Sequence, residues 1–145
     1  MRPRRRADDD GQTALLIVGF FAVAVLLVGV VVDASAAYLQ RQSLNALADG
    51  AAIAAADGVQ GEQVYTEGLG QYADIDPLMA ESYVRDYLAQ TGAAQRFPGL
   101  TVRVEPVGTS VTVRVAAPLD LPIPPPGFAD RTVVTGAASA VVVVR

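Results

Sequence analysis

Positions 13–32 hold a run of twenty residues without a charge or a proline, TALLIVGFFAVAVLLVGVVV. As an α-helix this run would be about 30 Å long, which is the hydrocarbon thickness of a bilayer. A surface helix of a soluble protein has a polar face, whereas this run is apolar all round. Its glycines, Gly19 and Gly29, would destabilise a water-exposed helix but are common in membrane spans. The run therefore predicts a transmembrane helix.

The basic residues around the run indicate its orientation. Four arginines stand close before it: Arg2, Arg4, Arg5 and Arg6. The next basic residue is Arg41, and loops rich in Lys and Arg stay in the cytoplasm. We therefore predict a single-pass protein of the cell membrane, with residues 1–12 in the cytoplasm and residues 33–145 outside. Binding of these arginines to anionic lipid or nucleic acid is the alternative interpretation of the cluster.

A cleavable secretory signal is the competing interpretation of the N-terminus. The tripeptide Ala34-Ser35-Ala36 has the A-x-A form of a cleavage site, and a basic segment precedes the apolar run. The apolar region of a signal peptide is about 7–15 residues long, however, which is shorter than the run found here. We expect a retained anchor. The alternative is a secreted, non-catalytic binding module released near Ala36.

The composition argues against an enzyme. The chain has no histidine, cysteine or lysine, which removes the usual nucleophile–base pairs, zinc sites and phosphate-binding lysines. From Asp33 onward, twelve acidic residues face seven arginines, a net charge of −5 that disfavours binding to nucleic acid. The pair Asp74 and Asp76 is a weak metal motif, and capping of a helix by Asp76 explains half of it. We expect a protein without catalytic activity, cofactor or metal.

The helical pattern continues beyond the span. Residues 33–57 are mostly good helix formers, with Asp33 expected at the outer membrane interface. Apolar residues at helical spacing, among them Leu44, Leu47 and Ala51, form a stripe that packs either on the protein's own sheet or on similar helices. Gly58 is expected to end the helix, and residues 57–75 read as a loop. The candidate residues for packing in and near the membrane are Gly19, Gly29, Asp33, Ala34, Ala37, Leu44, Leu47 and Ala51.

The rest of the chain predicts a second helix and a small sheet. Asp76 followed by Pro77 predicts a helix start, giving a helix over 76–91. In residues 100–145, alternating apolar and polar residues on both sides of a turn predict a β-hairpin. A proline-rich connector over 118–127, either a rigid link or a ligand for an aromatic groove, then leads to a third strand over 131–144. The valine-rich end of that strand should be central in the sheet or covered by a partner. The expected fold class is α+β, with a long transmembrane helix that continues outside and an antiparallel sheet of about three strands.

An ordered set of residues around the apolar run resembles the N-terminal region of TadE/TadG-like proteins, which take part in assembly of the bacterial Flp (tight adherence) pilus. The residues that carry this resemblance are Asp10-Gly11-Gln12, Val32-Asp33, Tyr38, Arg41-Gln42, Leu44-Asn45-Ala46, Asp49 and Ala51-Ala52-Ile53-Ala54. The resemblance implies a pilin-like fold and a minor pilin or pseudopilin-like role in a pilus for cell adhesion or in a related secretion assembly. It also implies homo- or hetero-oligomers with other pilus subunits and contacts with inner-membrane assembly proteins. Pseudopilins cleaved by prepilin peptidase carry a glutamate five residues after the cleavage glycine, and Leu16 stands at that distance from Gly11. This departure argues against processing after Gly11.

Overall fold

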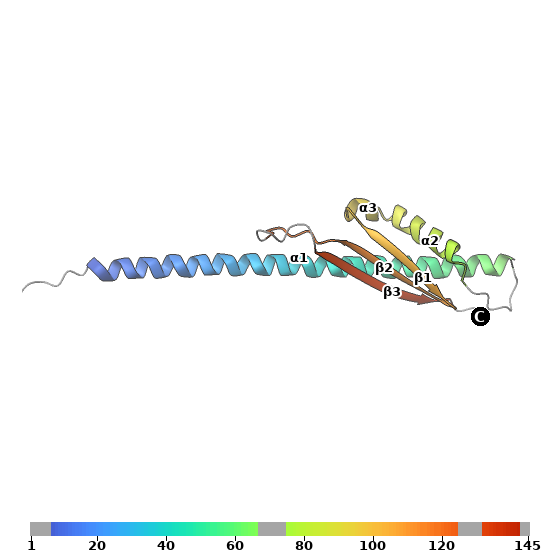
Figure 1. Cartoon of the computed structure of the whole chain (residues 1–145), viewed down its shortest axis with the longest axis horizontal. Coiled ribbons are helices and arrows are strands. Elements are labelled where there is room, and N and C mark those ends of the chain that lie inside the picture. The colour runs from blue at the N-terminus through green and yellow to red at the C-terminus, as the bar shows by residue number, and fades with distance from the viewer. Residues whose placement is uncertain (1–6, 67–74, 125–131, 143–145) are drawn as a thin grey trace, which may run out of the picture.

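One long helix forms the axis of the molecule (Figure 1). The computed structural model describes residues 7–66, 75–124 and 132–142. Helix α1, Ala7–Thr66, has 60 residues and a length of about 90 Å. The remaining elements pack on its C-terminal half, while the N-terminal half projects alone (Figure 1). The predicted continuation of the apolar helix beyond residue 32 is confirmed.

The expected end of this helix near Gly58 is wrong, because α1 continues through Gly58 and Gly61 to Thr66. The first ten residues of the expected 57–75 loop are therefore helical. Gly58 has a packing role instead: a Cβ atom there would lie 2.5 Å from Cγ of the Tyr83 ring. The glycine lets a second helix approach the axis of α1 closely. The sequence alone does not distinguish a glycine that ends a helix from one that makes room for an aromatic ring.

Helix α2, Pro77–Gln90, begins and ends as expected. The Asp76 side chain caps it by accepting a hydrogen bond from the Leu78 N–H at 2.9 Å. Gly92 follows its end in the left-handed conformation, with φ at +63°, and leads into the short helix α3, Ala93–Arg96. The Ala80 and Val84 side chains of α2 are buried in the hydrophobic core.

Three antiparallel strands form one sheet: β1 is Thr101–Val107, β2 is Ser110–Pro118 and β3 is Val133–Val141. Val107 pairs with Ser110, so β1 and β2 form a hairpin with a two-residue turn. The first turn residue, Gly108, has φ at +56°, a conformation that glycine adopts without strain. The predicted hairpin, the antiparallel three-stranded sheet and the α+β class are confirmed.

Strand β3 lies at the edge of the sheet, since the strand order is β1-β2-β3. Of the two alternatives for its valine-rich end, a central position in the sheet is therefore wrong. Its end is covered on one side: Val142, the residue after β3, is buried in the core, whereas Val141 is 60% exposed. The strand is also shorter than the expected 131–144, and residues 143–145 lie outside the described part of the chain. Covering of the exposed side by a partner stays a prediction.

The core lies between the inner face of the sheet and the C-terminal half of α1. Val111, Val113 and Val115 point from β2 into this core and are fully buried. The facing side of α1 consists mainly of small residues: Ala48, Ala51, Ala52, Ala55 and Ala56. Because these side chains are short, strands and helix approach closely. Gly136 of β3 shows this close approach, because a Cβ atom there would lie 2.5 Å from the Leu44 carbonyl carbon.

Candidate membrane-boundary site on the long helix

The N-terminal half of α1 leaves its apolar side chains uncovered. The segment is long and apolar enough to cross a membrane, and none of its most apolar window is buried in the protein. Phe20, for example, is 74% exposed. An exposed apolar surface that surrounds a helix for twenty residues far exceeds the patches that soluble monomers tolerate. This surface therefore needs an apolar environment, supplied by lipid or by other proteins.

The proline-rich connector turns back along α1 after β2. The Gln40 side chain holds its start: Nε2 donates to the Pro118 carbonyl at 2.6 Å, and Oε1 accepts from the Asp120 N–H at 3.1 Å. Gln40 thereby satisfies one acceptor and one donor at the point where the chain leaves the sheet. The connector then runs beside α1 toward the N-terminal half of that helix (Figure 1).

Asp33 is the next point of attachment. Its Oδ1 atom accepts a hydrogen bond from the Ile123 N–H at 3.0 Å. Asp33 is also the first charged residue after the apolar run, so this bond lies where that run ends. Hydrogen bonds to an ionised carboxylate are stronger than neutral ones, which makes the contact a suitable latch for the connector.

An apolar groove of about 670 Å³ lies beside this latch. Its walls are the face of α1 from Phe21 to Asp33 on one side, and Ile123 with Pro124 on the other. Among the lining residues that the structure describes, Asp33 is the only charged one, and it lies at the end nearer the folded domain. The other lining side chains are hydrocarbon, so the groove suits the binding of an apolar group and not catalysis.

The predicted packing residues fall into two groups in the structure. A Cβ atom added at Gly19 or Gly29 would have no neighbour within 4 Å, and Gly29 lines the groove. Ala34 is exposed, and Ala37 lines a hollow beside the start of β3. Leu44, Leu47 and Ala51 are buried within the protein's own domain, which is the first of the two alternatives for the apolar stripe.

The remaining predicted residues lie apart from this site. Arg2, Arg4, Arg5, Arg6 and Asp74 lie outside the described part of the chain. Gly11 and Leu16 are exposed residues of α1. Asp76 acts as the cap of α2. Within the described ranges, no three acidic side chains gather into a group that could hold a metal ion.

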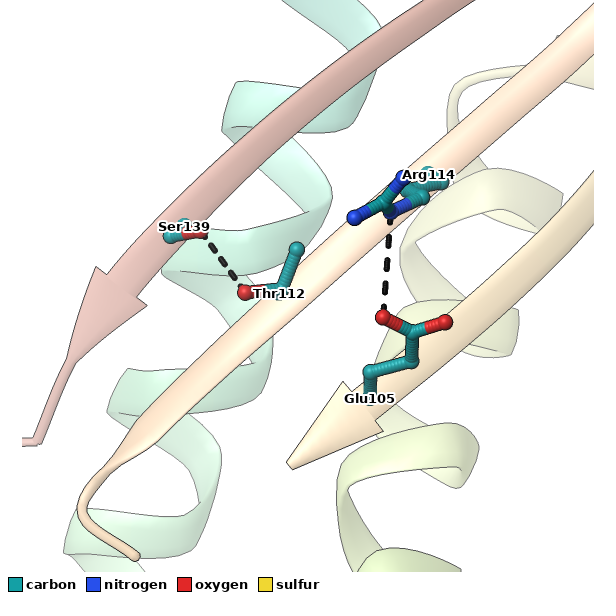
Figure 2. A network of polar contacts seen from close by, with 4 residues as sticks. All are labelled: Glu105, Thr112, Arg114 and Ser139. Carbon is teal, nitrogen blue, oxygen red and sulfur yellow. Dashed lines mark hydrogen bonds and ion pairs between the residues drawn. The ribbon is translucent and has the colours of Figure 1, made fainter. Parts of the chain in front are cut away.

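The outer face of the sheet carries polar side chains that bind one another (Figure 2). Thr112 and Ser139 share a hydrogen bond of 2.7 Å between β2 and β3. Arg114 lies directly opposite Arg103 in the register, and Glu105 offsets this repulsion at 3.7 Å from the Arg114 Nε atom. These side chains are largely exposed, so the face is a solvated surface and forms no enclosed site.

Sequence reasoning does not find Gln40 and Ile123 as parts of the boundary site. It places Asp33 at the interface, but the partner of Asp33 lies 90 positions away along the chain. The sequence gives only an indirect signal for this contact: a connector with few N–H groups and an apolar tip follows the sheet. Such a segment has no periodicity that would point to its contact on the helix.

Comparison with known proteins finds a family match for the N-terminal part of the chain. Residues 11–58 match a family model described as "Putative Flp pilus-assembly TadE/G-like". The resemblance predicted from the sequence is confirmed over this segment, and the match supports a role in pilus assembly. The matched segment contains the apolar half of α1, Asp33, Gln40 and most of the buried stripe. No curated protein and no solved structure matches the chain.

Proposed function

We propose that this protein, whose residues 11–58 match the TadE/G-like Flp pilus-assembly family, is a membrane-anchored, minor pilin- or pseudopilin-like subunit. It acts structurally, by packing its long helix against other subunits of a Tad/Flp pilus or a related secretion assembly. The observation that carries the proposal is the division of α1: one half is bare and apolar, and the other half is the core of a folded domain.

This division suits a subunit that is stored in the bilayer before assembly. Lipid covers the bare half of α1 until neighbouring helices replace it. Lipid is as apolar as leucine, so helices associate in membranes through close packing at small residues instead of hydrophobic burial. Gly19 and Gly29 offer such small positions with open space beside them, and Ala34 is an exposed one. The buried stripe around Leu44 is already used within the subunit.

The proposed topology is single-pass, with the N-terminus in the cytoplasm and the α+β domain on the outer side. The arginine-rich residues 2–6 support this orientation through the positive-inside rule. Partners are then other pilus or pseudopilin subunits, which meet the exposed face of α1, and inner-membrane assembly proteins. Asp33 and the latch on Ile123 would hold the domain close to the membrane surface.

A deletion strain tests the role in assembly. Complementation with the natural chain should restore the amount of pili sheared from the cells. Gly29→Ile should restore less at equal protein level, because it fills a position where helices would approach. Leu26→Ile, a change of shape at an already large residue, is the matched control and should restore fully. Unchanged piliation in the deletion strain would overturn the proposal.

Intact mass of the protein from cells decides between the anchor and the released module. The proposal requires that residues 12–36 remain in the chain. A product that starts at Ala37 would establish release by signal peptidase instead.

A further inference from the structure

We propose that the tip of the connector, Ile123 and Pro124, is a second membrane contact, and that the groove between this tip and α1 binds an acyl chain of an outer-leaflet phospholipid. The inference rests on the proposed membrane anchoring and adds a lipid-binding site to it. Three observations support it: the position of the tip along α1, the hydrogen bonding of its backbone N–H groups and the apolar lining of the groove.

The level of the tip follows from two attachment points. Asp120 is held by Gln40, and Ile123 is held by Asp33, seven residues nearer the N-terminus of α1. Seven residues of helix correspond to about 10.5 Å, and three extended residues of connector span about 10 Å. The connector is therefore long enough to run beside the helix toward the span, with bends at Pro122 and Ile123. It reaches the end of the apolar run at Ile123, and Pro124 lines the groove together with helix residues within the span.

The backbone N–H groups of the tip do not oppose contact with hydrocarbon. An unsatisfied N–H group is costly in lipid, so irregular segments avoid that environment. Pro122 and Pro124 have no N–H group, and the N–H of Ile123 is bonded to the Asp33 carboxylate. In the described connector, therefore, no N–H donor from residue 122 to residue 124 is left without a partner. The Ile123 side chain is meanwhile 56% exposed within the protein, an apolar group placed at the membrane surface.

The groove continues the membrane-facing surface of α1 without a break. It extends from Phe21 to Asp33, about 18 Å of helix, which is slightly more than one leaflet of a hydrocarbon core about 30 Å thick. The α1 wall is apolar along this length up to Asp33, and Ile123 with Pro124 form the other wall near the Asp33 end. The single charge among the described lining residues lies at the end where lipid headgroups begin. A flexible, apolar acyl chain fits this lining, and lipid surrounds the span in the proposed anchored state.

Site-directed fluorescence in vesicles tests the contact. The chain has no cysteine, so single cysteines can be labelled with the environment-sensitive fluorophore NBD without other changes. The test position is Ile123→Cys. Val23→Cys, in the middle of the span, is the positive control, and Val107→Cys, at the exposed end of β1 beside the hairpin turn, is the aqueous control. Each full-length variant is reconstituted in phosphatidylcholine vesicles, with or without lipids that carry a doxyl quencher on the acyl chain.

The proposal predicts that doxyl lipid quenches the label at 123 several-fold more than the label at 107, while aqueous iodide quenches it less. Asp33→Ala in the same background should reduce the doxyl quenching at 123 and leave it unchanged at 23. A label at 123 that behaves like the one at 107, while the label at 23 is quenched by lipid, overturns the lipid contact but not the anchor. Loss of lipid quenching at 23 overturns the proposed function itself. Protection from both quenchers that grows with the protein-to-lipid ratio would assign the groove to a second copy and overturn the acyl-chain site.

Discussion

Replacement of Gly58 by alanine probes how α2 packs on α1. The sign of the change in stability distinguishes a glycine that faces open space from one that makes room for Tyr83. In a helix interior with open space, Gly→Ala stabilises by about 0.8–1 kcal/mol, because alanine loses less conformational entropy. Gly58 does not face open space. A new Cβ would lie 2.5 Å from Cγ and Cδ1 of Tyr83 and 2.6 Å from Cδ2, which is far inside normal contact distance.

The clashing atoms are at the root of the tyrosine ring, so a rotation of the ring does not remove them. Helix α2 must move away from α1, and overpacking of this kind costs about 1–3 kcal/mol. After subtraction of the helix-propensity gain, Gly58→Ala should destabilise the domain by up to about 2 kcal/mol. Gly61 is the matched control: it lies in the same helix with no atom within 4 Å of an added Cβ. Gly61→Ala should stabilise by about 0.5–1 kcal/mol.

Guanidinium titration of the full chain in detergent micelles, followed by the near-ultraviolet circular dichroism of its tyrosines, measures these differences. In a Tyr83→Ala background the clash is absent, so Gly58→Ala should become stabilising. Equal stabilisation by Gly58→Ala and Gly61→Ala in the natural background would refute the close packing of Tyr83 on α1.

Three further predictions concern the contacts around α1. Gly136→Ala should destabilise by about 1–3 kcal/mol in the same titration, since its Cβ would meet the Leu44 backbone, whereas Ala137→Val on the exposed face should stay within about 0.5 kcal/mol. Leu44→Ala, at a side chain with no exposed surface, should destabilise by about 2–5 kcal/mol, and Leu78→Ala, at an exposed side chain, by less than about 0.5 kcal/mol. Equal effects within either pair would contradict the packing described. Asp33→Ala should speed hydrogen exchange of the Ile123 amide, and Gln40→Ala should speed that of the Asp120 amide, as measured by mass spectrometry. An unchanged exchange rate at either amide would show that its hydrogen bond does not form.

Features with local signals could be predicted from the sequence. The apolar run is long enough to read without knowledge of its neighbours, and Asp76-Pro77 combines a cap with a preferred first residue of a helix. The hairpin follows from alternating residues on both sides of a turn that contains Gly108. In each case, residues close in sequence determine the structure.

Features that depend on distant residues could not be predicted in the same way. The role of Gly58 requires Tyr83, and the edge position of β3 depends on the order in which three strands pair. The latch between Asp33 and Ile123 joins a helix to a connector without periodicity. For the candidate site, therefore, the sequence predicted the apolar run of α1 that ends at Asp33 but not the segment that returns to it.

Alkaline carbonate extraction of membranes tests the central claim, that the bare half of α1 is held in a bilayer. Cells that produce the natural, full-length chain are broken, and their membranes are washed with carbonate before centrifugation and immunoblotting. The account predicts that the full-length protein stays in the membrane pellet. Its quantitative release into the supernatant would contradict the anchor and the stored-subunit role that depends on it.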